Sequence, residues 1–305
     1  MVLNLVVKNV KGVGILRIIT LVENTLLENP NLIKEHGLSM LIETSKEKIL
    51  FDTGQSDAFV KNAAKLNIDL NTISHIVLSH AHYDHSNGLK FLLEKINSKP
   101  TLIVAKDFFN NSNKFYKTVN TKDGIINEEL NYIGVNFSKE FILAKKIDVH
   151  YVEQDTLSIS PTITVHRNFS KANNFEKINE NMKLKLNNDF IIDSFKDEIA
   201  IAIETEKGLL LLVGCSHCGI INTIETIKNR TNKNIYGVIG GTHLIEADEN
   251  RIDKTLEYFK NINLEFIGLS HCTGKKALDI LKSKSNNYTI CSTGKILDFT
   301  EIEIS

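Results

Sequence analysis

The sequence predicts an α/β fold in a single domain. Short apolar runs typical of buried strands alternate with segments of helical spacing, and several of these runs end at a histidine. The 305 residues suffice for one large α/β domain or two small ones. Since neither an internal repeat nor a domain boundary is visible, we expect one domain over 1–305.

The first third of the chain supplies strands and helices in regular order. Runs rich in isoleucine, leucine and valine, bounded by polar residues, indicate strands. Between them, Phe59, Val60, Ala63 and Ala64 recur at helical spacing. In order, the expected elements are a strand at Leu16–Val22, a hairpin of Ser39–Thr44 and Lys48–Phe51, a helix over 57–66, a strand at Ser74–Ser79, a helix over 88–95 and a strand at Thr101–Ala105.

The segment 106–195 has a different composition. It is rich in asparagine, lysine and serine, with scattered aromatic residues and a short expected strand at Thr162–His166. Loops of this length inside a domain are usually functional or partly mobile. We therefore expect a long insertion, or a lid over the site, at about 106–195.

Regular alternation of strand and helix resumes after this segment. Strands are expected at Glu198–Glu204, Gly208–Val213, Ile235–Ile239 and Phe266–Leu269, and helices over 220–229 and 249–261. A helix and two short strands should close the chain. Three of the apolar runs lead directly into a histidine, which makes their ends candidate site positions.

Composition and charge exclude several classes of function. Lysine and arginine number 36 and aspartate and glutamate 37, so the net charge of −1 offers no nucleic-acid footprint. No apolar run is long enough to cross a bilayer, and Lys8, Lys11 and Arg17 argue against a signal peptide. Four cysteines in a chain this long do not form a disulfide framework. We expect a cytoplasmic protein with no membrane and no nucleic-acid partner.

The strongest local signal is the run His80-Ala81-His82-Tyr83-Asp84-His85. His80 and His82 are two residues apart in an extended segment, so their side chains should point to the same side. Together with Asp84 and His85 they form a dense nitrogen and oxygen donor set that suits zinc, iron or manganese. The sequence therefore predicts a metal site where a buried strand opens into a loop.

Three further strands end in a histidine, namely His217, His243 and His271. Each histidine follows a short apolar run and a small residue, and each is followed by a helix. Ligands at strand ends converge when the strands lie side by side in one sheet. A single histidine of this kind is usually structural, but three in the same context favour a shared site.

These motifs resemble the metallo-β-lactamase superfamily. The histidine run, followed by Ser86-Asn87-Gly88-Leu89, is similar to the metal-binding signature of that superfamily, and Phe51-Asp52-Thr53-Gly54 is similar to its upstream acidic motif. The resemblance implies a four-layer αββα sandwich with a binuclear metal centre at one edge. It implies that His80 and His82 bind the first metal, that Asp84, His85 and His271 bind the second, and that Asp52 fixes an imidazole tautomer.

The middle of the superfamily pattern is altered in this chain. The superfamily supplies a third histidine and then a bridging aspartate after Gly-Asp, whereas the corresponding strand here ends in Gly214-Cys215. We expect His217 to be the third ligand, with His166 as the alternative, and Cys215 to stand near the bridging position or to line the site. This departure leaves open whether the second metal site is filled.

The motifs around Cys215, His243 and His271 are similar to one branch of the superfamily, the dihydropterin ribofuranosylaminobenzene phosphate synthase-like metal-dependent hydrolases. Within them, Cys215-x-x-Cys218 also allows a structural zinc site completed by Cys272, or a redox pair. Packed, inert side chains are the simpler interpretation of Cys218 and Cys291, and we interpret His36, His75 and His150 as ordinary histidines.

We expect an enzyme that uses one or two divalent metal ions, zinc first and iron or manganese as alternatives. Such an ion lowers the pKa of a bound water and polarises a substrate oxygen. Asp84 and His243 are the expected catalytic residues. The predicted activity is hydrolysis of an ester, lactone, thioester or phosphoester, and the partner is a small molecule, with phosphorylated and pterin-like compounds among the candidates. The alternatives are a pterin-handling transferase and an iron-binding redox or sensor module.

Overall fold

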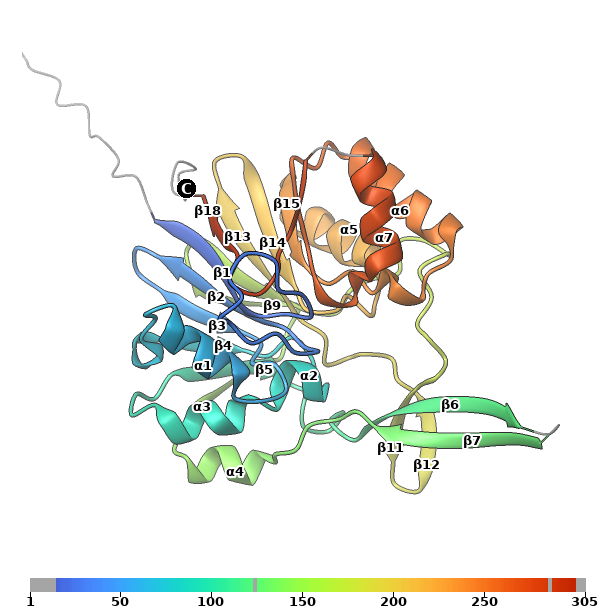
Figure 1. The fold of residues 1–305 in the computed structure, drawn as a ribbon, viewed down its shortest axis with the longest axis horizontal. Helices are drawn as coiled ribbons and strands as arrows, with labels where there is room; N and C mark the ends of the chain where they lie inside the picture. The colour runs from blue at the N-terminus through green and yellow to red at the C-terminus, as the bar shows by residue number, and fades with distance from the viewer. Residues whose placement is uncertain (1–14, 123–124, 285–286, 300–305) are drawn as a thin grey trace, which may run out of the picture.

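The computed structural model describes residues 15–122, 125–284 and 287–299 in four layers (Figure 1). Two seven-stranded sheets face each other, and helices cover the outer face of each sheet. The layers confirm the αββα sandwich that the sequence resemblance implies. Lys8 and Lys11, which argue against a signal peptide, lie outside the described residues.

The first sheet contains most of the N-terminal half. Its order is β18-β1-β2-β3-β4-β5-β8. The strands are β18 (Ile296–Asp298), β1 (Leu16–Val22), β2 (Ser39–Thr44), β3 (Lys48–Phe51), β4 (His75–Val77), β5 (Thr101–Ala105) and β8 (Val149–Val152). Its outer face is covered by α1 (Ala58–Lys65), α3 (Leu89–Lys95) and α4 (Lys139–Ala144). The short helix α2 (Tyr83–Ser86) lies at the end of β4.

The second sheet has the order β17-β16-β15-β14-β13-β10-β9. The strands are β17 (Tyr288–Ile290), β16 (Phe266–Leu269), β15 (Ile235–Gly240), β14 (Gly208–Val213), β13 (Ala200–Thr205), β10 (Ile163–His166) and β9 (Thr156–Ser160). It is covered by α5 (Ile220–Thr231), α6 (Glu249–Asn261) and α7 (Lys275–Lys284). Strands β14, β15 and β16 run parallel, so their carboxyl ends reach the same edge.

The apolar sequence pattern explains why the two sheets stack. In β14, Leu210 and Leu212 enter the core between the sheets, while Leu209 and Leu211 enter the core beneath the helices. Strands that are buried on both faces read as continuous apolar runs instead of alternating ones. In β2, Met40 faces the other sheet in the same way. The buried sandwich therefore provides a rigid frame for the loops that follow the strands.

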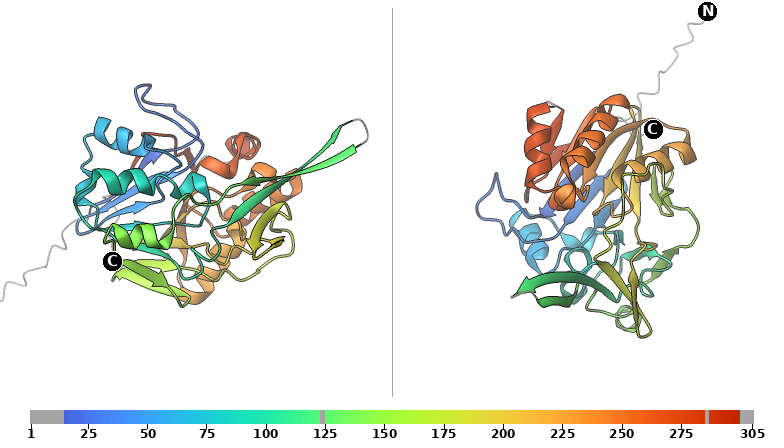
Figure 2. Two further views of the ribbon diagram at one scale, coloured as in Figure 1. Left: turned by 90° about the horizontal axis from the view of Figure 1, so that it is seen from below. Right: turned by 90° about the vertical axis from the view of Figure 1, so that its right-hand side faces the viewer.

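The segment 106–195 divides between the sandwich and a separate sheet. Strands β8, β9, β10 and helix α4 belong to the main layers. The separate sheet has the order β12-β11-β6-β7. Its strands, which we call the arm, are β6 (Lys114–Lys122), β7 (Ile125–Tyr132), β11 (Met182–Leu186) and β12 (Asp189–Ile192). Figures 1 and 2 show the β6–β7 hairpin extending away from the body of the molecule.

None of the helices in the described part of the chain combines the length and the apolar character that a bilayer crossing requires.

Candidate metal centre

The candidate site lies where strands of both sheets end. The first sheet supplies the loop after β4 with His80 and His82, and the second sheet supplies the loops after β14, β15 and β16. The backbone around the site is left-handed at four positions, with φ of 59° at Asp52 after β3, 57° at Ser216, 46° at His243 and 52° at His271. Residues other than glycine rarely adopt this conformation, and strain of this kind concentrates at functional sites.

Three buried imidazoles form the first donor group. One ring nitrogen from each of His80, His82 and His217 lies within 4.8 Å of the other two. Nε2 of His82 and Nε2 of His217 have no hydrogen-bond partner among the described residues. Because burial holds the pKa of all three imidazoles well below the ordinary value, they are neutral, which is the form that binds a metal.

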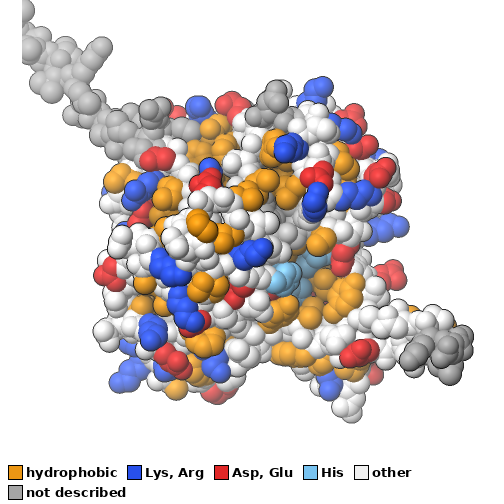
Figure 3. Space-filling model, in the orientation of Figure 1, with side chains coloured by type: hydrophobic (Ala, Val, Ile, Leu, Met, Phe, Trp, Pro, Cys, Tyr) orange, Lys and Arg blue, Asp and Glu red, His pale blue; other side chains and the backbone are white. Residues whose placement is uncertain are grey.

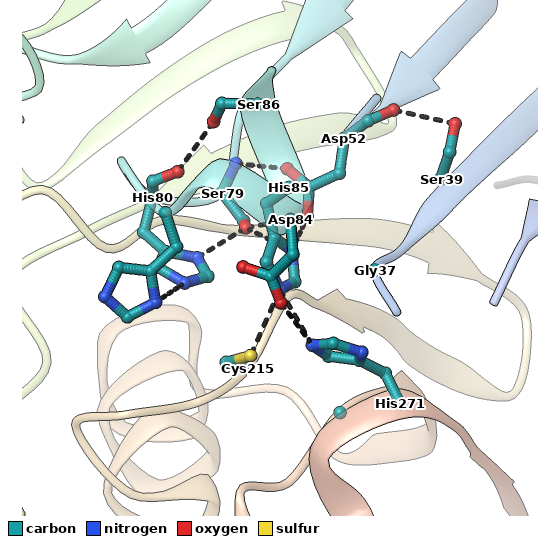
Figure 4. Close-up of polar contacts among 12 residues, drawn as sticks. Gly37, Ser39, Asp52, Ser79, His80, Asp84, His85, Ser86, Cys215 and His271 are labelled. Atoms are coloured by element: carbon teal, nitrogen blue, oxygen red, sulfur yellow. Dashed lines mark hydrogen bonds and ion pairs between the residues drawn. The ribbon is translucent and has the colours of Figure 1, made fainter. Parts of the chain in front are cut away.

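A second donor group lies beside the first (Figure 4). Nε2 of His85 lies 3.1 Å from Nε2 of His271 and 3.1 Å from Sγ of Cys215. The carboxylate of Asp84 is 3.2 Å from Nε2 of His271 and 3.1 Å from Nε2 of His36. Two imidazole nitrogens that face each other this closely can share one proton or can both face a cation.

Outer hydrogen bonds orient the rings of both groups. Nδ1 of His85 lies 2.6 Å from Oδ2 of Asp52, which is the contact that the superfamily resemblance implies. Nδ1 of His271 lies 2.9 Å from Oδ1 of Asn24, and Nδ1 of His80 lies 2.9 Å from Oγ of Ser79. A histidine that ligates a metal through one ring nitrogen usually donates a hydrogen bond from the N–H of the other to a partner of this kind. In each ring the Nδ1 partner leaves Nε2 facing the centre.

In the second group, the mutual interaction of His85 and Asp84 favours the charged form of both side chains. Burial lowers the pKa of His85, but the carboxylates of Asp52 and Asp84 outweigh burial and raise this pKa to about 9. Burial raises the pKa of Asp84, but His85 and the hydrogen bonds from His271 and His36 bring it well below the ordinary value. The negative charge of Asp84 therefore lies among imidazoles, as it would among ligands of a divalent ion.

The structure brings together seven of the residues that the sequence proposes as ligands, namely His80, His82, Asp84, His85, Cys215, His217 and His271. Cys215 faces both groups, because its Sγ forms one set with His80 and His85 and another with His217 and His243. His243 is held by Glu246, whose Oε2 lies 3.1 Å from Nε2. Burial lowers the pKa of His243, but the nearby sulfur of Cys272 and the carboxylate of Glu246 raise it to about 10.

Other cysteines and histidines occupy different positions. Sγ of Cys218 lies 3.8 Å from the Phe195 carbonyl and joins none of the donor sets found among the described residues, while Cys291 packs in the core between the sheets. His166 lies in β10 with Nδ1 3.4 Å from Arg230, also outside those donor sets. His75 and His150 contact Glu47 and Asp148 respectively. Among the two candidates for a third ligand, only His217 lies beside His80 and His82.

Sequence reasoning missed His36 as a member of the centre, and it placed Cys272 only in an alternative structural zinc site with Cys215 and Cys218. His36 is half-exposed in the loop between β1 and β2, and it forms a donor set with Asp84 and His271. Cys272 forms a set with Cys215 and His271. His36 follows no apolar strand and so carries no local signal. The position of Cys272, directly after a strand-end histidine, was the available clue for that residue.

The donor chemistry fits one or two divalent metal ions. Buried polar atoms are nearly always hydrogen-bonded, so two unpartnered imidazole nitrogens beside a third indicate a ligand that the protein itself does not supply. Imidazole nitrogen, carboxylate oxygen and thiolate sulfur are the ligands that zinc takes. Figure 3 shows histidine side chains in a hollow of the surface, next to hydrophobic side chains.

Comparison with known proteins agrees with this geometry. The family model of the metallo-β-lactamase superfamily matches residues 33–157. The 7,8-dihydropterin-6-methyl-4-(β-D-ribofuranosyl)-aminobenzene-5'-phosphate synthase of Methanocaldococcus jannaschii is 31% identical over 95% of this chain and 99% of its own. An uncharacterized protein of the same archaeon is 32% identical over 91% of this chain and 98% of its own.

A solved structure is similar over the same length. It is the crystal structure of a metal-dependent hydrolase of the β-lactamase superfamily, with 28% identity and a TM-score of 0.75, and the match covers 92% of this chain and 98% of that chain. The resemblance seen in the motifs is thus confirmed by similarity along almost the whole sequence. The chain belongs to the metallo-β-lactamase superfamily, in the branch that contains the two archaeal proteins.

Proposed function

We propose that this protein is a metal-dependent hydrolase that cleaves an ester, lactone, thioester or phosphoester. The observation that carries the proposal is the pair of buried, unpartnered Nε2 atoms of His82 and His217 beside His80. Three neutral imidazoles that converge in this way form a catalytic metal site when a position stays open to water and substrate. The similar solved hydrolase supports the same reaction class.

Each donor group would hold one ion. His80, His82 and His217 would bind the first, and Asp84, His85 and His271 would bind the second. Cys215 forms donor sets with residues of both groups, so its sulfur would be available as a further ligand to either ion. We propose zinc as the metal, with iron or manganese as the alternatives, since the mixed nitrogen, oxygen and sulfur donors suit zinc and iron best.

The reaction would divide between the ions and this chain's own side chains. Bound ions of this kind activate water as a nucleophile and polarise the substrate oxygen. Asp84, whose carboxylate stays ionised, can accept a hydrogen bond from the attacking water and orient it. The charged His243 carries a proton on Nδ1, and this atom is buried without a partner among the described residues. His243 can therefore donate a hydrogen bond to a negatively charged substrate or leaving group.

The second candidate is a pterin-handling transferase. The observation that favours it is the 31% identity, over nearly the full length of both chains, to an enzyme named as a dihydropterin ribofuranosylaminobenzene phosphate synthase. A small phosphorylated substrate is common to both candidates, because His243 offers a cationic donor to a phosphate in either reaction. All four cysteines are free, which supports the proposal of a reducing, cytoplasmic setting.

The test compares His82→Ala with His166→Ala, a histidine outside the donor sets. Purified variants are reconstituted with zinc and assayed on a panel of phosphoesters, lactones and thioesters. We expect His82→Ala to lose metal-dependent turnover and His166→Ala to retain it. Equal turnover in both variants would refute the proposal. Thermal shift with a reduced pterin separates the candidates, because only the transferase should be stabilised by the pterin.

A further inference from the structure

A buried lysine connects the arm to the loop that carries the first donor group. Lys114, the first residue of β6, is fully buried, and its Nζ contacts the carboxylates of Asp193 and Asp197. The Nζ–Oδ1 distance to Asp197 is 2.9 Å. Both aspartates are also buried. Charges are retained in a protein interior when they are paired and hydrogen-bonded, so these three side chains form one unit.

The two carboxylates use their remaining oxygens on backbone groups near the metal centre. Oδ2 of Asp197 accepts a hydrogen bond of 2.8 Å from the backbone N–H of Ala81, the residue between His80 and His82. Oδ1 of Asp193 accepts one of 2.8 Å from the backbone N–H of Phe195. The unit therefore fixes the peptide that joins two expected ligands.

Phe195 links the lysine unit to His217, the third imidazole of the first donor group. Its ring stacks on the ring of His217 with centroids 4.1 Å apart and planes inclined by 10°, and its edge contact with His82 has a centroid distance of 5.6 Å. Nζ of Lys114 lies 4.6 Å from the centroid of Phe195. One ammonium group thus touches both the carboxylate that holds Ala81 and the ring that supports His217.

Two further hydrogen bonds attach the segment 133–136 after β7, which we call the base of the arm, to the loop over 80–87, which we call the ligand loop. The backbone N–H of Tyr83 donates to the carbonyl of Ile133 at 3.0 Å. The backbone N–H of Asn136 donates to Oδ1 of Asn87 at 2.8 Å. These contacts lie on either side of Asp84 and His85. The ligand loop and the base of the arm are therefore joined at several points, and the lysine unit is the buried one.

We propose that Lys114 is a positioning residue of the metal centre: its pairing with Asp193 and Asp197 holds His80, His82 and His217 in register, so docking of the arm is a condition for tight metal binding. This inference rests on the metal centre proposed above. It assigns the arm a role in the metal centre, because the arm supplies the cation on which the ligand loop depends.

Metal affinity separates this role from simple stabilisation of the fold. A buried ion unit that only stabilises the fold would, when broken, lower the unfolding temperature of the metal-free protein and leave the dissociation constant of the metal unchanged. A positioning unit must change that constant. Mutation of the outer partners of metal ligands typically weakens metal binding about 10- to 100-fold.

The experiment uses the full-length protein, loaded with zinc in competition with a chelator of known affinity. Lys114→Met removes the ammonium group, and Asp197→Ala removes the acceptor of Ala81 while it leaves Lys114 paired with Asp193. The control is Lys117→Met on the same strand, since Lys117 pairs with Glu128 at the surface of the arm. Hydrogen exchange at the Ala81 amide is measured in parallel without metal.

We expect Lys114→Met and Asp197→Ala to weaken zinc binding about 10- to 100-fold and to accelerate exchange at Ala81, with Lys117→Met unchanged. If Lys114→Met does not fold, Asp197→Ala is the deciding variant. In that variant Lys114 and Asp193 still form an ion pair of zero net charge in the interior. A folded Asp197→Ala with the wild-type zinc dissociation constant would overturn the inference alone. Wild-type protein without zinc affinity would overturn both the proposed function and the inference.

Discussion

Asp52→Asn tests the outer hydrogen bond that orients the second donor group. The fully buried carboxylate of Asp52 accepts three hydrogen bonds, from the backbone N–H of Ser79 at 2.7 Å, from Oγ of Ser79 at 2.7 Å and from Nδ1 of His85 at 2.6 Å. An asparagine oxygen can replace one carboxylate oxygen, but its NH₂ group would face a ring nitrogen that must itself donate. His85 would then carry its proton on Nε2, the atom that faces Cys215 and His271.

The expected loss follows from this tautomer change. Replacing the partner of a ligating histidine weakens metal binding about 10- to 100-fold, or by about 1.4–2.8 kcal/mol. The assay is chelator competition for both metal equivalents, with Asp57→Asn, a surface carboxylate paired with Lys61, as the control. In the metal-free protein the pKa of His85, now about 9, should fall, and a nuclear magnetic resonance titration of the imidazole measures it.

Two results would refute this reasoning. One is a metal dissociation constant within about threefold of wild type, or roughly 0.7 kcal/mol. The other is an unchanged pKa of His85 in the metal-free variant. Either would mean that Asp52 does not set the tautomer of His85.

Two further substitutions probe the frame of the site. A methyl group at Gly214 would meet Oγ of Ser79 at 2.1 Å, so Gly214→Ala should lower the free energy of unfolding by about 1–3 kcal/mol and weaken metal binding, and urea unfolding with zinc titration would show both. Burial lowers the pKa of His166 from 6.5 to about 4, helped by the charge of Arg230. The unfolded chain binds a proton at His166 at a higher pH than the folded protein does. The free energy of unfolding therefore decreases as the pH falls from about 6.5 to about 4, by at most about 3 kcal/mol. His166→Gln should remove that part of the pH dependence in urea unfolding at pH 7 and pH 5, and an unchanged slope would contradict it.

The order of strands and helices was predictable because burial dictates it. Strands such as Leu16–Val22 and Gly208–Val213 are apolar on both faces, and their observed bounds equal the expected ones. The convergence of His217, His243 and His271 was predictable for the same reason, since strands β14, β15 and β16 end at one edge. The apolar pattern of these strands therefore predicts which histidines meet at one edge of the sheet.

The arm and its contacts were not predictable from local pattern. Strand β11 pairs with β6 through Lys183 and Phe115, which are far apart in the sequence, and β12 is exposed along its whole length. Strands with so little burial leave no periodic signal. Lys114 looks like an ordinary surface lysine until Asp193 and Asp197 surround it. His36 likewise gains its meaning only from the approach of Asp84 and His271.

Metal content of the purified protein tests the central claim most directly. The measurement is elemental analysis by mass spectrometry of wild type, His217→Ala and His271→Ala after reconstitution with zinc. We predict about two equivalents in wild type and about one in each variant, because each substitution removes a ligand from a different donor group. Wild-type protein that retains no metal, or a His217→Ala variant that keeps both equivalents, would contradict it.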